Sequence, residues 1–239
     1  MYHRFGDIAC DPFCVSVNQF DRQMRYLAEN KLAVSFDELE EFLAGKRQLS
    51  VDSVIITVDD GFHSVYSEML PVLRRWEIPA VAYVSPSLIG TEGNASRRYM
   101  TWDELGQLAE SGVVIGSHAW SHRSLGRLSV EEVREEADRS REELRKRLSI
   151  DTTTFAYPYG TRADFSELTG NVLRQSGYRT AFTTQHGGIV PDCDAIELPR
   201  IKVERGDPMW MFRQLCRGGI DGWRHVDRFL WRLQKSPGR

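Results

Sequence analysis

Short apolar runs alternate with amphipathic stretches along most of the 239-residue chain. The apolar runs are rich in β-branched residues and show little polar alternation, which is typical of parallel strands buried on both faces. They cover residues 54–58, 80–84, 113–117, 154–157, 180–183 and 197–201, with residues 1–4 as a further candidate. This pattern predicts a parallel sheet.

Helical spacing is found between these predicted strands. Apolar side chains recur every three or four residues in four stretches, which are 16–29, 64–76, 102–110 and 129–148. The last stretch begins with Ser129 and Glu132, a capping box, and its many Glu and Arg residues predict a solvated face. Strand–helix alternation of this kind indicates a closed barrel or a doubly wound sheet in a single domain.

Two further observations favour the barrel. Six or seven predicted strands within about 200 residues fit a small α/β barrel. No G-x-G-x-x-G sequence follows any of the predicted strands, so a dinucleotide-binding sheet loses support.

Composition is that of an ordinary globular protein, with 41% apolar and 27% charged residues. The net charge of −3 provides no general attraction to nucleic acid, so we expect no nucleic-acid partner. The four scattered cysteines predict reduced thiols, and no bilayer-spanning run or signal peptide is visible. We therefore expect a cytoplasmic protein, although a natural start slightly upstream of Met1 would make this expectation less secure.

Candidate catalytic side chains gather where the predicted strands end, the place where α/β barrels carry their functional residues. Asp59 and Asp60 follow the strand 54–58, and "SHAWSH" supplies His118 and His122 after the strand 113–117. "FAYPYG" ends the strand that begins at residue 154, and "MYHR" begins the chain. These residues are expected to lie at one edge of the barrel.

The residue types at this edge are those of a hydrolytic metal site. His118 and His122 lie four positions apart, so a helical turn places both imidazoles on one face, where they can share a metal. One carboxylate completes a set that leaves coordination positions open for water and substrate. The second aspartate can then act as a base. Each pattern alone is also compatible with a surface histidine or a surface turn, but their joint occurrence at strand ends favours the metal site.

Three motifs, in this order and spacing, resemble those of a known family. "TVDDG" (57–61), "SHAWSH" (117–122) and "FAYPYG" (155–160) are similar to the first three motifs of the polysaccharide deacetylases, the NodB-homology enzymes of carbohydrate esterase family 4. The resemblance covers roughly residues 1–205. It implies a distorted (β/α)7 barrel and a metal-dependent hydrolase that removes N-acetyl groups from an N-acetylated sugar or glycan precursor.

The resemblance also implies roles for individual residues. Asp59 is the expected catalytic base, and Asp60, His118 and His122 are the expected metal ligands. Tyr159, in the third motif, is expected to offer its backbone N–H to the oxyanion. Two imidazoles and one carboxylate suit zinc, and cobalt, nickel or manganese are alternatives.

The chain departs from the family pattern in three places. Val58 stands where phenylalanine is usual, and Ala156 stands where an arginine usually pairs with the base. The closing strand that carries a general-acid histidine is missing after residue 200. In a circularly permuted branch, resembling the poly-N-acetylglucosamine deacetylases, that motif lies at the front of the chain. "MYHR" (1–4) is similar to it, which makes His3 the expected general acid.

Arg200 in "LPRI" is the candidate replacement for the missing arginine. It ends the predicted strand 197–201 at the same edge of the barrel, so its guanidinium can reach Asp59. A surface arginine or one that braces a loop is the alternative at this position.

Other functions remain open at this point. The same fold and site could serve a deformylase or another amide hydrolase. A catalytically decayed glycan-binding protein is a further alternative, which the complete set of aspartates and histidines opposes and Ala156 favours.

Residues 206–239 follow the recognised domain. Between residues 205 and 239 the chain has eight Lys or Arg residues against three Asp residues. We expect a basic helical extension packed on the same domain. An alternative is peripheral contact with a membrane surface or a lipid-linked glycan.

Overall fold

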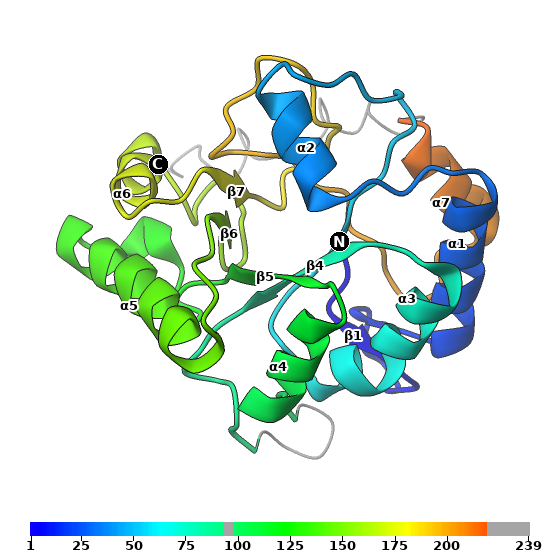
Figure 1. Cartoon of the computed structure of the whole chain (residues 1–239), viewed down its shortest axis with the longest axis horizontal. Helices are drawn as coiled ribbons and strands as arrows, with labels where there is room; N and C mark the ends of the chain where they lie inside the picture. The colour runs from blue at the N-terminus through cyan, green and yellow to red at the C-terminus, as the bar shows by residue number, and fades with distance from the viewer. Residues whose placement is uncertain (93–97, 219–239) are drawn as a thin grey trace, which may run out of the picture.

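A curled sheet of five parallel strands forms the centre of the computed structural model, which describes residues 1–92 and 98–218. Neighbours in the chain are neighbours in the sheet, as Figure 1 shows. The strands are β3 (Ile56–Val58), β4 (Ala80–Val84), β5 (Val114–Ser117), β6 (Thr154–Ala156) and β7 (Thr180–Phe182). Almost every strand residue is buried, as the apolar runs predicted.

The two ends of the described chain close this sheet into a ring. Tyr2 forms a parallel bridge with the last residue of β3, and Leu198 forms one with the last residue of β7. Between them, the backbone nitrogen of Met1 donates to the carbonyl oxygen of Ile201 at 2.8 Å. The chain therefore forms a distorted α/β barrel in which residues 1–2 and 198–203 complete the wall.

Helices surround the barrel (Figure 1). All four predicted helical stretches are present, and serine or threonine side chains cap three of the helices at their first turns. These are α1 (Val17–Glu29), α3 (Leu70–Trp76), α4 (Trp102–Glu110) and α5 (Val130–Leu148), and a π-helical segment (Val65–Met69) precedes α3. The alternation of strands and helices is therefore confirmed.

Several short elements were not predicted. They are the strand β2 (Cys14–Val15) and the helices α2 (Phe36–Leu43), α6 (Glu167–Gln175) and α7 (Met209–Cys216). The candidate strand at residues 1–4 is present only in part, as the bridge at Tyr2 and the start of β1 (Arg4–Phe5). None of these helices exceeds nine residues, so few turns are available to show a helical period. The predicted strand 197–201 is reduced to the bridge at Leu198.

Helix α7 begins the predicted C-terminal extension. Phe212 is buried, and its ring lies 6.3 Å from that of Tyr26 on α1. Residues 219–239, with Trp223 and Trp231, lie outside the described residues, so the extension as a whole stays a prediction.

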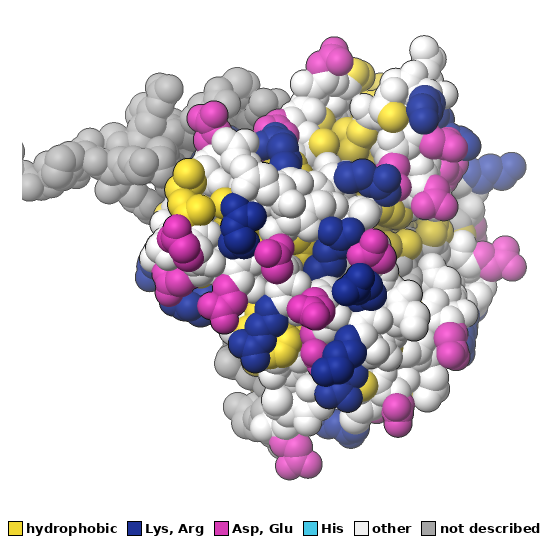
Figure 2. Space-filling model, turned by 60° about the vertical axis from the view of Figure 1, so that its left-hand side comes forward, with side chains coloured by type: hydrophobic (Ala, Val, Ile, Leu, Met, Phe, Trp, Pro, Cys, Tyr) yellow, Lys and Arg dark blue, Asp and Glu magenta, His cyan; other side chains and the backbone are white. Residues whose placement is uncertain are grey.

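The surface carries charges of both signs side by side. On the face shown in Figure 2, Lys and Arg side chains are interspersed with Asp and Glu side chains. Ion pairs such as Arg141–Asp151 at 2.9 Å and Arg174–Asp194 at 2.6 Å contribute to this pattern. On this face the mixed charges are typical of a solvated surface.

Candidate active site

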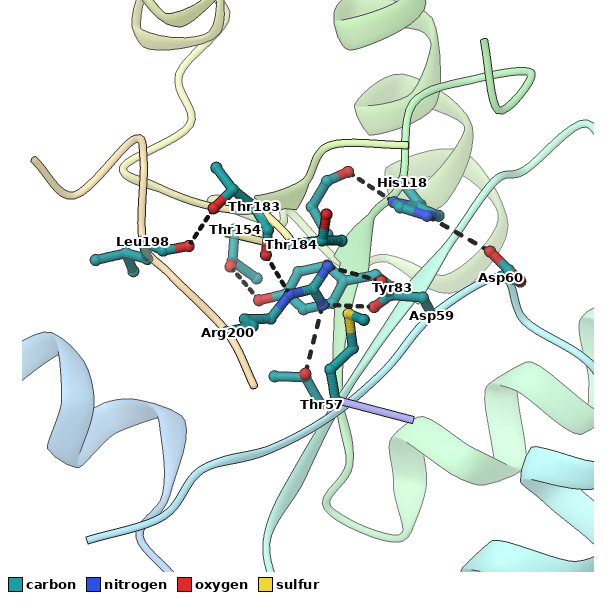
Figure 3. Close-up of polar contacts among 12 residues, drawn as sticks. Thr57, Asp59, Asp60, Tyr83, His118, Thr154, Thr183, Thr184, Leu198 and Arg200 are labelled. Atoms are coloured by element: carbon teal, nitrogen blue, oxygen red, sulfur yellow. Dashed lines mark hydrogen bonds and ion pairs between the residues drawn. The ribbon is translucent and has the colours of Figure 1, made fainter. Parts of the chain in front are cut away.

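Asp59 and Arg200 form a buried ion pair inside the barrel (Figure 3). The two guanidinium nitrogens Nη1 and Nη2 donate to Oδ1 and Oδ2 of Asp59, each at 2.7 Å. Arg200 also donates from Nε to the carbonyl oxygen of Thr183 at 2.9 Å. Only 2% of the Asp59 side chain and 4% of the Arg200 side chain are exposed. The contact expected from "LPRI" is therefore present.

This pair keeps Asp59 ionised. Burial alone would raise the pKa of the Asp59 carboxyl, but the positive charge of Arg200, with smaller contributions from His118 and His3, outweighs burial and lowers it. Each carboxylate oxygen that accepts from Arg200 has a second lone pair. Asp59 can therefore accept a further hydrogen bond, for example from a water molecule.

Asp60 turns away from its neighbour towards the two histidines. Its backbone adopts a positive φ of 77°, which separates its side chain from that of Asp59. Oδ1 of Asp60 lies 3.1 Å from Nε2 of His122 and 3.5 Å from Nε2 of His118. Burial alone would raise the pKa of the Asp60 carboxyl, but its interactions with the His118 and His122 imidazoles lower it far below its usual range.

The donor set fits a divalent metal ion. One ligand atom from each of Asp60, His118 and His122 lies within 4.8 Å of the other two. Two imidazole nitrogens and one carboxylate oxygen are ligands that zinc and neighbouring transition metals accept. The structure thus brings together the three residues that were predicted to bind metal.

The backbone of β6 orients His118. Nδ1 of His118 lies 2.6 Å from the carbonyl oxygen of Ala156, and the imidazole is buried. An Nδ1–H that donates to this carbonyl leaves the lone pair of Nε2 facing Asp60, as a metal ligand requires. Ala156, where the family pattern has an arginine, contributes here through its main chain.

His122 and Tyr159 lie together on the rim of the barrel. Their rings pack edge to face with centroids 5.0 Å apart, and both residues have a positive φ, 59° and 61°. The carbonyl of Tyr159 accepts a hydrogen bond from Thr184, whereas its N–H donates to no residue that the structure describes. This N–H is therefore available to a ligand.

His3 is placed at the same edge by the closure of the barrel. The N–H of Asp59 donates to the carbonyl oxygen of Tyr2 at 3.0 Å. His3, the next residue after Tyr2, therefore lies close to Asp59 at the edge of the barrel. The His3 ring packs against Phe13, and its buried Nδ1 has no partner among the described residues. Burial lowers the pKa of His3, and the charges of Asp59 and Asp60 oppose part of this shift.

Two buried carboxylates near His122 were not predicted. Glu136 on α5 accepts hydrogen bonds from Ser121, and Asp164 accepts one from Ser124. The sequence predicted a solvated face for the charged residues of α5, and this interpretation is wrong for Glu136, which is 5% exposed. Its position in the sequence could have indicated burial. Glu136 lies three residues after Val133 and four residues before Ser140, which are both buried residues of α5.

Comparison with known proteins gives the family. The model of the family described as polysaccharide deacetylase matches residues 46–181, more than half of the chain. A putative polysaccharide deacetylase of Bacillus subtilis (strain 168), YxkH, is 25% identical over 207 residues, which cover 86% of this chain and 71% of that protein. The poly-beta-1,6-N-acetyl-D-glucosamine N-deacetylase of Staphylococcus aureus (strain MRSA252) is 25% identical over 202 residues, covering 80% and 68%.

Solved structures share the fold. IcaB from Ammonifex degensii superimposes with a TM-score of 0.78 at 26% identity, covering 90% of this chain and 94% of that one. The Streptococcus pyogenes deacetylase PplD, solved in complex with acetate, superimposes with a TM-score of 0.80 at 21% identity, covering 90% and 96%. With the family model matching the segment that holds "TVDDG", "SHAWSH" and "FAYPYG", the chain belongs to the polysaccharide deacetylase family.

Proposed function

We propose that the chain is a metal-dependent hydrolase that removes N-acetyl groups from an N-acetylated sugar or glycan. The observation that supports this most directly is the ionised Asp59 beside the Asp60–His118–His122 set, at the edge where β3 and β5 end. The staphylococcal relative is named for poly-β-1,6-N-acetylglucosamine, so this polymer is the first substrate to test.

Asp60, His118 and His122 would hold the metal, for which we propose zinc. When bound, such a cation polarises the acetyl carbonyl and makes a nearby water more acidic. The remaining chemistry is assigned to residues of the chain itself.

Asp59 serves as the base that removes a proton from the attacking water. Its two bonds from Arg200 hold the carboxylate in one orientation and keep it ionised, while the free lone pairs of its oxygens accept from water. Arg200 thus takes the place of the arginine that the third motif lacks.

Tyr159 and His3 act on the two ends of the scissile amide. The backbone N–H of Tyr159 donates to the oxygen that becomes negative during attack. A protonated His3 donates to the departing sugar nitrogen. The ordinary pKa of an imidazole is close to neutral pH, and the charges of Asp59 and Asp60 oppose part of the lowering of the His3 pKa by burial.

The decisive experiment measures acetate release from β-1,6- and β-1,4-linked N-acetylglucosamine oligomers, UDP-N-acetylglucosamine and an N-formyl analogue. We expect acetate release that a chelator abolishes and added zinc or cobalt restores. Full activity in metal-stripped protein would contradict the proposal. Metal binding without release of any acyl group would instead support a glycan-binding protein.

The location and the C-terminal surface stay predictions. None of the helices in residues 1–92 and 98–218 combines the length and apolar character needed to cross a bilayer. The excess of basic residues beyond residue 205 supports peripheral contact with an anionic membrane or lipid-linked glycan at the cytoplasmic side. Cosedimentation with anionic and with neutral vesicles tests this contact.

A further inference from the structure

We infer that Glu136 and Asp164 are positioning residues that together hold the loop carrying His122 in its metal-binding conformation. We call this pair the carboxylate clamp. The inference rests on the proposed function, because the residue held by the clamp is a proposed metal ligand.

The loop needs support because its backbone conformation is unfavourable. His122 has a φ of 59° and Ala119 has a φ of 61°, in the left-handed region that residues with a Cβ atom rarely adopt. Such a conformation persists where surrounding contacts determine it. We therefore attribute the conformation of His122 to the hydrogen bonds made by the residues on both sides of it.

Glu136 holds the residue immediately before His122. Its Oε2 accepts the backbone N–H of Ser121 at 2.8 Å, and its Oε1 accepts the Ser121 hydroxyl at 2.5 Å. An ionised carboxylate is purely an acceptor, so it matches two converging donors, and such charge-assisted bonds are stronger than neutral ones. Because Glu136 is buried in α5, the loop is tied to a rigid helix.

Asp164 holds the loop on the other side of His122. Its Oδ1 accepts the hydroxyl of Ser124 at 2.5 Å, while its Oδ2 accepts the N–H of Thr161 at 2.9 Å and the Thr161 hydroxyl at 2.5 Å. Thr161 begins the turn that ends at Asp164, and it lies two residues after Tyr159. Asp164 therefore links the histidine loop to the segment that presents the proposed oxyanion donor.

The backbones of these two segments are also in direct contact. The N–H of Gly126 donates to the carbonyl oxygen of Asp164 at 2.8 Å. A Cβ atom at Gly126 would lie 2.1 Å from the carbonyl oxygen of Ala163, closer than any side chain permits. The two loops thus pack directly against each other, without room for a side chain at Gly126.

The clamp holds the residue before His122 by its backbone N–H and hydroxyl, and the second residue after His122 by its hydroxyl. The direction of the His122 imidazole is thereby determined by the protein before a metal is bound. Neither carboxylate is among the residues assigned to the reaction, so their role is positioning. Supporting residues of this kind typically change metal affinity about ten- to a hundredfold when they are removed.

The test compares Co2+ binding by metal-free variants of the full chain. Glu136→Ala removes both acceptors of Ser121, and we expect it to weaken Co2+ binding about ten- to a hundredfold and to change the visible Co2+ spectrum. We also expect kcat to fall while KM stays constant. Glu136→Gln should recover most of the affinity, since its amide oxygen still accepts the Ser121 N–H and its amide nitrogen can donate to the hydroxyl.

Two controls separate positioning from stability. Glu135→Ala changes the neighbouring glutamate on α5, whose side chain is 71% exposed, and should leave both Co2+ affinity and Tm unchanged. Tyr178→Phe removes a buried hydrogen bond from its hydroxyl to the carbonyl of Ala137 on the same helix, 3.0 Å long. It should lower Tm but leave Co2+ affinity unchanged.

If Glu136→Ala does not fold, Ser121→Ala and Ser124→Ala each remove a single side-chain bond of the clamp and should weaken Co2+ binding less. Amide hydrogen exchange of residues 118–124 in the metal-free protein should accelerate in every clamp variant and in neither control. Wild-type Co2+ affinity and unchanged exchange in the clamp variants would overturn the inference, as would an equal loss of affinity in Tyr178→Phe. Co2+ binding by the wild type without acetate release would instead overturn only the proposed function.

Discussion

Asp59 and Asp60 are adjacent in the chain, yet they belong to two regions that are built differently. Asp59 lies within the barrel, after β3, and pairs with Arg200 from the segment that follows the bridge to β7. Both side chains are almost completely buried. Asp60 lies at the rim among loop residues, and it shares a positive φ with His122 and Tyr159.

The difference shows which forces determine each half of the site. Asp59, the proposed base, is fixed by strands and a buried ion pair, so a change there should affect folding and turnover together. Among the proposed ligands, His118 is buried after β5 and oriented by the backbone of β6, whereas the loop that carries His122 has an unfavourable backbone held by hydrogen bonds from neighbouring elements. A change at the rim should therefore alter metal affinity more than it alters the free energy of unfolding.

The largest expected effect distinguishes the two aspartates directly. Asp59→Asn keeps the shape of the side chain but removes the base, so acetate release should fall by about two to four orders of magnitude while the metal is retained. Asp60→Ala should instead lose the metal. Metal content and initial rates measured on the same preparations check this prediction. Loss of metal in Asp59→Asn would show that the two roles are reversed.

His3→Ala tests the proposed general acid, which acts on the leaving sugar nitrogen and not on the attacking water. We expect the fold and the metal to be retained and amide hydrolysis to fall by about two to four orders of magnitude. The loss should be smaller for an acetyl ester with a good leaving group, because that group departs without a proton. Rates on both substrates measure the difference, and near wild-type amide hydrolysis would exclude His3 as the acid.

Arg200→Met tests the buried region through stability. It leaves the Asp59 carboxylate buried without its partner, which should cost about 3–5 kcal/mol of the free energy of unfolding. Urea denaturation of the metal-free protein measures this cost. The double variant Asp59→Asn/Arg200→Met should recover part of it, since no charge is then left unpaired. Strictly additive losses would indicate that the ion pair does not act as a unit.

The smallest expected effect is at the rim. Tyr159→Ala removes the exposed ring beside His122 but retains the backbone N–H. The loss of turnover should stay well below the roughly hundredfold loss that follows removal of an oxyanion donor. Steady-state kinetics measure it, and a loss of a hundredfold or more would mean that the ring itself contributes to the reaction.

The sequence predicted that the site lies at the strand ends for two reasons. Parallel buried strands produce continuous apolar runs, and the carboxyl ends of such strands meet at one edge of the barrel. This argument also led from Ala156 to Arg200, whose contact with Asp59 the structure contains. It did not identify Asp164, because the hydrogen bond of Asp164 with Ser124 joins two loops 40 residues apart in the chain. Such a pairing depends on how the loops pack, and no local period encodes it.

The closure of the barrel has a consequence for the order in which the enzyme is made. The hydrogen bond between Met1 and Ile201 joins positions 200 residues apart, and residues 1–2 fill the wall beside β3. At synthesis rates of about 5–20 residues per second, roughly 10 to 40 s pass between the emergence of His3 and that of Arg200. During this interval the first segment of the wall has a partner on one side only. The nascent chain therefore carries the proposed acid, His3, long before Arg200 can pair with Asp59, and we expect activity only after the last part of the ring has been synthesised.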